Sequence, residues 1–464
     1  MREPGDSLRP GSVVDGFLVG EPLHEGGQGV LYAVTRASGE RDATPLLIKV
    51  PRLGPGQPGE SVVTYEVERM VLSTLQGRHV PRFVAAGDLV AQPYLVMERV
   101  EGRSLADEAQ PLPPLEVARL GAAVARALQA VHAQGAIHLD LKPSNVILRP
   151  DGQAVLIDFG LSRHLRYPDL LGEEARAPVG SAPYVSPEAV LGIRNDPRSD
   201  LFSLGALLYE LATGELPFGA PTSSGGLRQR LWMDPVPPRA HARGIPVWLQ
   251  EVILRCLEPD PAERYQTAAA VAADLESPGR IVVTERGQRL RSVGSRKRVA
   301  RWVRQLGSGL MALGPAEESG ARVVLVAVAT QHTNEERNEA LRAEAARLVK
   351  GEAAIRFACV AVIKPASDPA SAARGATAQR IRHLVLLRHW AEGLSLPPGQ
   401  VTHHVIESGD AAEALLDYAR RNHVDQVLIG APPRDVALGG LVGTVAMKVM
   451  AGASCTVTVV RPRS

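Results

Sequence analysis

The apolar and polar positions of the first 280 residues predict strands followed by helices. Short apolar runs within residues 16–100, such as 46–48 and 94–97, are typical of buried strands, and one helical stretch is expected over 61–75. Further along, apolar residues recur at helical spacing. The helices predicted there cover 115–134, 201–211 and 247–257. Regular structure is expected to pause near 277–279, where Ser, Pro and Gly follow one another.

The pattern changes after residue 321, where strand-like and helix-like segments alternate. The strand-like segments are 323–328, 357–363, 401–406, 427–429 and 456–460. The helical stretches are 334–349, 376–390, 410–422 and 443–451. Near-continuous apolar strands that alternate with helices indicate a parallel α/β sheet.

Composition excludes several classes of protein. The chain has 464 residues, of which 45% are apolar and 22% charged, which is typical of a globular protein and not of a disordered or fibrous one. A net charge of +2 argues against a nucleic-acid binder. Three distant cysteines argue against a disulfide framework or zinc ribbon and favour a reducing compartment. With a polar N-terminus and no apolar run of about 18 residues, the expected location is cytoplasmic.

Residues 280–320 carry a local excess of positive charge. The basic residues are Arg286, Arg289, Arg291, Arg296, Lys297, Arg298, Arg301 and Arg304. Apolar residues follow them at helical spacing, so the 286–306 segment could form a basic amphipathic helix on an anionic membrane surface. A solvated helix between two domains explains the same pattern.

Two features near the N-terminus suggest phosphate binding, although neither is specific alone. The segment 23–32 reads Leu-His-Glu-Gly-Gly-Gln-Gly-Val-Leu-Tyr, and its glycines would let a strand-turn-strand backbone close over phosphates. An ordinary hairpin turn explains it as well. Lys49 ends an apolar strand, where it could contact phosphate oxygens, with Glu68 as its ionic partner. A snorkelling lysine and a solvated glutamate are the simpler alternatives.

A third motif is far more specific. Residues 138–145 read His-Leu-Asp-Leu-Lys-Pro-Ser-Asn, and 156–160 read Leu-Ile-Asp-Phe-Gly. Phosphoryl transfer needs a carboxylate to accept a hydroxyl proton, a cation beside the moving phosphate and oxygen ligands for Mg²⁺. Asp140, Lys142, Asn145 and Asp158 supply these groups within a short stretch of chain.

These motifs resemble the eukaryotic-like Ser/Thr protein kinases of bacteria over residues 16–277. The resemblance implies an α+β bilobal protein-kinase fold, with an N-lobe over 16–98 and a C-lobe over 99–277. It also implies that ATP lies under the loop 23–31, against Leu23, Gly26, Gly29 and Leu31. Met97 would then gate the adenine pocket, and the backbones of Glu98 and Val100 would bind adenine.

The resemblance assigns roles to the remaining motif residues. Lys49, held by Glu68, would contact the α and β phosphates, and Asp158 and Asn145 would hold Mg²⁺. Asp140 would accept the proton of a substrate Ser or Thr, and Lys142 would offset charge on the γ-phosphoryl group. The implied cofactors are therefore ATP and Mg²⁺, and the implied partners are protein substrates. Other residues that match the family are Asp200, Gly205 and Arg264, with Arg264 placed to pair with Glu188.

Several positions depart from the family pattern. His24 replaces the first glycine of the loop, and Leu31 replaces the usual valine. Leu139 replaces the arginine that meets a phosphate on the activation segment in this family. Residues 161–180 contain no threonine, and their hydroxyls are Ser162 and Tyr167. We therefore predict that activity does not require phosphorylation of this segment. Ser181 stands where the family has threonine and keeps the hydroxyl.

The C-terminal part, residues 321–462, resembles universal stress proteins, which implies a Rossmann-like domain after a basic linker over 278–320. Gly430 lies in a Gly-Ala-Pro-Pro run, and Gly443 and Thr444 follow nine residues after that run, close to the family's nucleotide-binding signature. Pro433 and Ala329 depart from it, by replacing a glycine and an aspartate. A second nucleotide site at Gly430, Gly443 and Thr444 and a sensing or dimerisation module with a vestigial pocket both remain open. A homodimer is expected by analogy alone.

Two functions of different classes follow. The first is an ATP-dependent Ser/Thr protein kinase in stress or signal transduction, with a C-terminal regulatory or sensing domain. The second is a non-catalytic nucleotide-binding scaffold, that is, a pseudokinase joined to a stress-sensing module. The complete set Lys49, Glu68, Asp140, Asn145 and Asp158 favours the enzyme.

Overall fold

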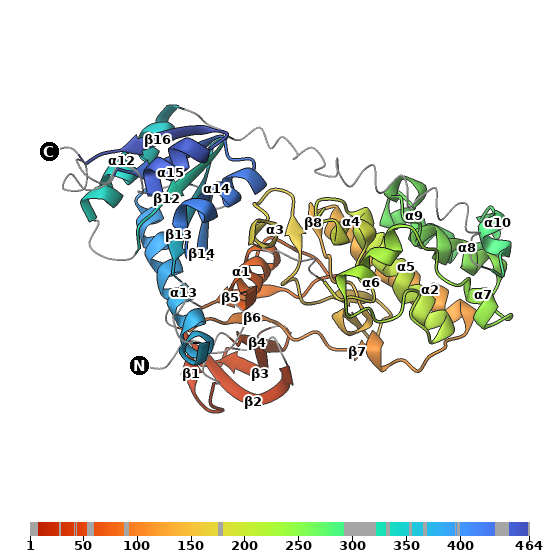
Figure 1. Ribbon diagram of the computed structural model, residues 1–464. Coiled ribbons are helices and arrows are strands. Elements are labelled where there is room, and N and C mark those ends of the chain that lie inside the picture. Colours follow the sequence, from red (N-terminus) through yellow and green to blue (C-terminus); the bar gives the residue numbers. More distant parts are fainter. Residues whose placement is uncertain are drawn as a thin grey trace.

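Figure 1 shows the computed structural model of the chain. The structure describes residues 8–462 except for 27–28, 41, 43, 53–59, 88–91, 175–179, 292–321, 331–334, 352–354, 365–368, 395, 397–399 and 432–444. Within these ranges the chain forms an antiparallel sheet with one helix, a helical lobe and a separate parallel α/β domain (Figure 1).

The N-lobe is an antiparallel sheet of six strands in the order β1-β2-β3-β4-β6-β5. Its strands are β1 (Val13–Val14), β2 (Phe17–Gly26), β3 (Gly29–Arg36), β4 (Leu46–Pro51), β5 (Phe83–Ala86) and β6 (Leu95–Glu98). Helix α1 (Glu60–Leu72) connects β4 to β5. Apolar side chains of alternate strand positions, including Ile48 and Val96, form a core on one side of the sheet, as period-two patterning predicts.

The C-lobe is built mainly of helices. The longer ones are α2 (Pro114–His132), α5 (Arg198–Thr213), α8 (Val247–Cys256) and α9 (Ala268–Glu276). The shorter ones are α3 (Leu170–Glu174), α4 (Pro187–Val190), α6 (Ser224–Arg228), α7 (Pro238–His241) and α10 (Glu285–Gln288). Two small sheets lie at the boundary with the N-lobe, β10-β9-β7 and β11-β8. Their strands are β7 (Arg103–Ser104), β8 (Ala136–Ile137), β9 (Val146–Leu148), β10 (Ala154–Leu156) and β11 (Arg163–His164).

The C-lobe continues past the predicted domain end at 277. Residues 285–288 form α10, which packs on α8, and Gly287 is buried there. Arg286 pairs with Glu251 at 2.7 Å and with Glu258 at 3.0 Å. The first arginine of the predicted basic segment is therefore engaged by the kinase lobe, while residues 292–320 lie outside the described part of the chain.

The C-terminal domain has a parallel sheet of five strands in the order β14-β13-β12-β15-β16. The strands are β12 (Arg322–Ala327), β13 (Ile355–Ile363), β14 (Val401–Glu407), β15 (Gln426–Gly430) and β16 (Thr456–Val460). Helices α12 (Glu335–Gly351) and α13 (Pro369–Glu392) share a core with one face, and α14 (Ala411–Arg421) and α15 (Val445–Gly452) share a core with the other. The predicted parallel α/β sheet is confirmed.

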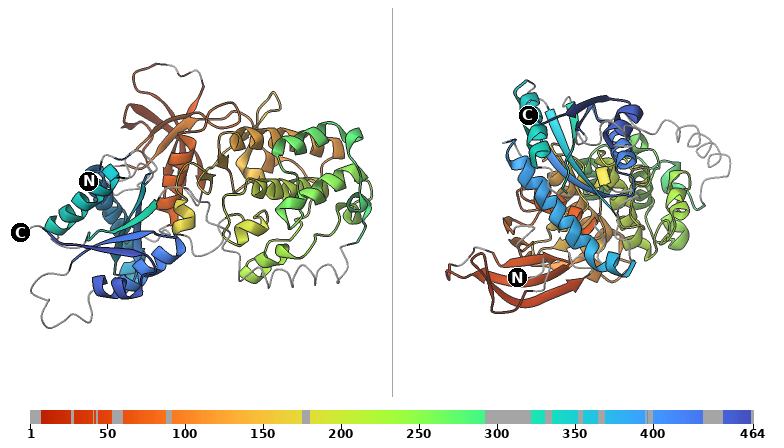
Figure 2. Two further views of the ribbon diagram at one scale, coloured as in Figure 1. Left: turned by 90° about the horizontal axis from the view of Figure 1, so that it is seen from above. Right: turned by 60° about the vertical axis from the view of Figure 1, so that its left-hand side comes forward.

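The C-terminal domain lies against the kinase domain, beside α1 and α3. Figures 1 and 2 show α13 running toward the N-lobe sheet, and β14 and α14 facing α3. Ion pairs join the two domains, Arg388 with Glu66 and Arg356 with Glu173. Among the described residues, none of the helices is both long and apolar enough to span a bilayer.

Candidate active site

Three charged side chains from distant parts of the sequence meet between the lobes. Lys49 lies in β4, Glu68 in α1, and Asp158 follows β10. The Nζ atom of Lys49 donates to both oxygens of Glu68, at 2.9 and 2.7 Å, and to Oδ1 of Asp158 at 3.0 Å. The ion pair between Lys49 and Glu68 that was predicted from the sequence is present in the structure.

The electrostatics of this triad favour a charged lysine. Burial alone would lower the pKa of Lys49, but the carboxylates of Asp158 and Glu68 raise it above its usual value. Burial likewise works against ionisation of Asp158, yet the charge of Lys49 lowers the pKa of this carboxyl overall. Lys49 therefore stays cationic in this buried site.

Asp200 in α5 anchors the loop that carries the catalytic candidates. Its carboxylate is fully buried and accepts hydrogen bonds from the backbone N–H groups of His138 and Leu139, both at 2.8 Å. His132 also lies 2.8 Å from it. Leu139 adopts a left-handed conformation with φ of 59°, and Asp158 does so with φ of 65°. Non-glycine residues in this region are costly and cluster at functional sites.

Asp140 is held by hydrogen bonds on both carboxylate oxygens. Its Oδ2 accepts from Lys142 Nζ at 2.8 Å and from Asn145 Nδ2 at 3.0 Å, and its Oδ1 accepts from the N–H of Ser181 at 2.9 Å. Ser181 Oγ in turn lies 3.0 Å from Lys142 Nζ. A carboxylate fixed in this way is preorganised to receive a proton from a hydroxyl placed beside it.

Asp158 and Asn145 offer the oxygen donors that a hard divalent cation prefers. The Ile157 N–H donates to the Asn145 carbonyl at 3.0 Å, which brings the two segments together. Because the Asn145 amide nitrogen bonds to Asp140, its oxygen points away from that carboxylate. Among the described residues, no group of three or more His, Cys, Asp or Glu side chains is placed to hold a metal ion.

The residues predicted to cover the nucleotide lie on β2 and β3. Leu23 and Gly26 are in β2, and Gly29 and Leu31 are in β3, where Gly29 pairs with Gly26 and Leu31 with His24. The turn at 27–28 lies outside the described residues. A Cβ at Gly29 would collide with the carbonyl oxygen of Val50, so strand packing requires glycine there.

The predicted hinge lies at the end of β6. Met97 is buried between β4 and β5, opposite Leu47 and Phe83. The Glu98 carboxylate pairs with Arg149 at 2.6 Å, and Val100 follows after the strand. This contact ties the hinge to the C-lobe and was not foreseen from the sequence.

The activation segment is fixed by charges and by a buried hydroxyl. Ser162 Oγ donates to the carbonyl of His138 at 3.0 Å, and Asp169 pairs with Arg194 at 3.0 Å. Further on, Arg264 forms a bidentate pair with Glu188 at 2.6 and 2.8 Å, which confirms that predicted pair. Gly205, another residue that matches the family, lets α5 approach Cys256 of α8 closely.

The C-terminal domain has a cavity of about 330 Å³ at the carboxyl ends of β12, β13 and β15. Gly430 and Ala329 line it, together with Arg337 and Asn338. This is the place where the strand order of the sheet reverses, the usual ligand position in such sheets. Gly443 and Thr444, the other two residues of the predicted second nucleotide site, lie outside the described residues.

Comparisons with known proteins agree with both resemblances. The family described as "Protein kinase domain" matches residues 20–275, and the "Universal stress protein family" matches 310–461. The serine/threonine-protein kinase PknL of Mycobacterium bovis is 33% identical over 277 residues, which are 59% of this chain and 68% of that protein. PknB of Mycobacterium leprae is 39% identical over 186 residues, 39% of this chain and 30% of that protein.

The chain thus spans about a third of the length of PknB, and two thirds of PknL. The kinase family matches more than half of the chain, and the two lobes, the Lys49–Glu68 pair and the Asp140 loop agree with it, so the chain belongs to the protein kinase family. Its C-terminal part matches the universal stress protein family, so the expected pairing of the two domains is confirmed.

Proposed function

We propose that this protein transfers the γ-phosphoryl group of ATP to Ser or Thr hydroxyls of proteins. The observation that carries the proposal is the set of hydrogen bonds by which Lys142, Asn145 and Ser181 hold the Asp140 carboxylate. The charged triad of Lys49, Glu68 and Asp158 supports it from the other side of the interlobe site.

In the proposed reaction, the oxygen of a substrate hydroxyl attacks the γ-phosphorus of ATP. The new O–P bond forms as the bond from the γ-phosphorus to the bridging oxygen breaks, ADP leaves with that bonding pair, and the hydroxyl proton goes to Asp140. Lys142 offsets negative charge on the γ-phosphoryl group, and Lys49 holds the α and β phosphates. These residues act mainly by positioning and electrostatics.

Asn145 and Asp158 would hold Mg²⁺ through their side-chain oxygens, and Mg²⁺ would supply charge neutralisation on the phosphates. Leu23, Gly26, Gly29 and Leu31 would cover the nucleotide. Met97 and the backbones of Glu98 and Val100 would enclose and bind its adenine ring.

The test is transfer of labelled phosphate from ATP to a generic basic protein, followed by identification of the labelled amino acids. We expect phosphoserine or phosphothreonine with the natural protein and at least a 100-fold lower rate with Lys49→Met, because its phosphate-binding cation is lost. Lys364→Met, which removes an exposed lysine after β13, is the matched control and should remain active. Equal rates for the natural protein and Lys49→Met would overturn the proposal, and they would be the expected result for a non-catalytic scaffold.

A further inference from the structure

A buried carboxylate of the activation segment is held by the C-terminal domain. Glu173 lies in α3, and its side chain is only 8% exposed. Arg356 of β13 contacts Oε1 at 2.5 Å, and on Oε2 the Tyr418 hydroxyl donates at 2.8 Å while His404 Nε2 lies at 2.7 Å. A buried charge is tolerated only when it is well paired, so this contact defines how the two domains fit together.

The charge state of Glu173 agrees with this geometry. Burial alone would raise the pKa of the Glu173 carboxyl, but the charges of His404 and Arg356 lower it to about 2. The carboxylate is therefore stabilised as an anion by groups that belong to the other domain.

A second contact lies on helix α1. Arg388 of α13 pairs with Glu66, which also pairs with Arg69 at 3.0 Å. Two residues further along the same helix, Glu68 pairs with Lys49. Positions two apart on an α-helix point in nearly opposite directions. Helix α1 therefore contacts the C-terminal domain on one side, and on the other side it contacts Lys49, the proposed phosphate-binding residue.

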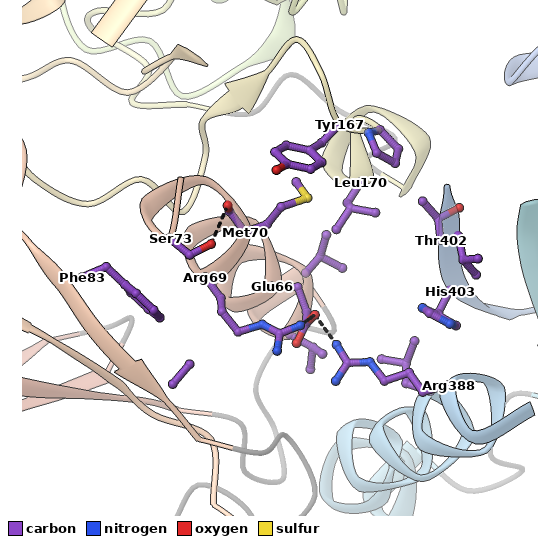
Figure 3. Close-up of a pocket in the computed structure, with 16 residues that line it drawn as sticks. Glu66, Arg69, Met70, Ser73, Phe83, Tyr167, Leu170, Arg388, Thr402 and His403 are labelled. Carbon is purple, nitrogen blue, oxygen red and sulfur yellow. Dashed lines mark hydrogen bonds and ion pairs between the residues drawn. The ribbon is translucent and has the colours of Figure 1, made fainter. Parts of the chain in front are cut away.

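Between these two contacts the domains enclose a cavity of about 490 Å³ (Figure 3). Its walls come from α1 and β5, from Tyr167 and from Leu170 of α3, and from α13 and β14 of the C-terminal domain. Buried apolar residues of both domains belong to one hydrophobic cluster, which includes Val63 and Leu384 beside the cavity. The domains thus meet through apolar side chains as well as through the two ion pairs, and interfaces between domains are in general more polar than obligate ones.

We infer that the C-terminal domain is a docking element that positions α1 and α3 for catalysis, with Glu66 and Glu173 as positioning residues. The inference rests on the proposed kinase function. The kinase domain itself has no arginine before Asp140 to receive a phosphorylated activation segment, since Leu139 stands there and is buried. In the docked arrangement, α3 is held by the ion pair of Glu173 with Arg356, and α1 is held by the ion pair of Glu66 with Arg388. Neither contact needs a phosphate group.

Charge reversal on the full-length chain tests this inference. Arg388→Glu places two carboxylates together and should lower kcat for a generic basic protein by about fivefold or more, the size expected when a coupled pair is broken. Hydrogen exchange should become faster over 60–72 and 170–174. The double variant Arg388→Glu with Glu66→Arg restores opposite charges and should recover at least about half of the lost kcat. Arg382→Glu, exposed on the same helix, is the matched control and should behave as the natural protein.

Tyr418→Phe provides a milder second variant, because it removes one hydrogen bond to Glu173 and keeps the ring. It should raise exchange over 170–174 and lower kcat by about twofold. If Arg388→Glu is as active as Arg382→Glu, or more active, with unchanged exchange over 60–72, the inference is wrong although the kinase function stands. Absence of phosphate transfer in the natural protein itself would instead refute the proposed function.

Discussion

Lys49 and Asp158 are 109 positions apart in the sequence, yet their side chains form an ion pair of 3.0 Å. The contact joins the N-lobe sheet to the segment that follows β10. Glu68 approaches the same ammonium group from α1 at 2.7 Å, so three elements converge on one cation. The position of α1 is therefore coupled to the geometry of the proposed phosphate-binding site.

The hydroxyl group of Ser181 should affect the rate of phosphate transfer more than the size of the side chain does. Ser181→Ala removes the contact with Lys142 Nζ, and a hydrogen bond to a charged group contributes about 1.5–3 kcal/mol. We expect kcat/KM for a protein substrate to fall by roughly 10-fold or more. Ser181→Thr keeps the hydroxyl and should retain most of the activity in the same assay. Equal losses in both variants would show that the hydroxyl is not what positions Lys142.

The close approach of α5 to α8 requires glycine at position 205. A Cβ there would lie 2.6 Å from the Cβ of Cys256, so Gly205→Ala should destabilise the C-lobe by about 1–3 kcal/mol through overpacking. Calorimetry of the full chain should show a lower transition temperature for the kinase domain. Gly225→Ala, exposed in α6 with open space around it, is the control and should leave the transition unchanged or slightly raised. A Gly205→Ala protein as stable as the control variant would contradict this packing.

Acidification should release the C-terminal domain from the kinase domain. Glu173 has a pKa of about 2 when docked, against an ordinary value of 4.5, so the docked state binds fewer protons than the released state between these values. Its contribution to docking is on the order of 3 kcal/mol above pH 4.5 and is lost progressively as the pH falls toward 2.

Small-angle scattering between pH 6 and pH 3.5 can follow this release as an increase in the radius of gyration, with circular dichroism to confirm that the helices persist. The variant Glu173→Gln lacks the titrating group, so it should be more extended throughout and show a weaker pH dependence. Identical pH profiles for the two proteins would rule out Glu173 as the group responsible.

Local sequence patterns were sufficient for the catalytic loop and for most of the elements. Asp140, Lys142 and Asn145 lie within six positions, and the turn that joins them is short, so their proximity follows from the sequence directly. The parallel sheet of the C-terminal domain could be predicted because β12, β13 and β15 are nearly continuous apolar runs and helical stretches separate the strands.

Contacts between distant segments could not be predicted in this way. Glu173 and Arg356 are 183 positions apart, and nothing in the residues around either one indicates the other. The same holds for Arg388 with Glu66 and for Arg149 with Glu98. Arg286 was grouped with a run of basic residues, whereas its partners Glu251 and Glu258 become visible only when α10 packs on α8. Long-range ion pairs depend on the complete fold and leave no periodic signal.

The most direct test of the central claim separates binding of ATP from the chemical step. Equilibrium binding of Mg·ATP and kcat for a protein substrate should both be measured for the natural protein and for Asp140→Asn. The account predicts an affinity within about threefold of the natural value and a kcat lowered at least 100-fold, because the proton acceptor is lost while Lys49 and Asp158 remain. An unchanged kcat would contradict the assignment of Asp140, and loss of ATP binding in parallel with kcat would contradict the proposed division of roles between the two sides of the site.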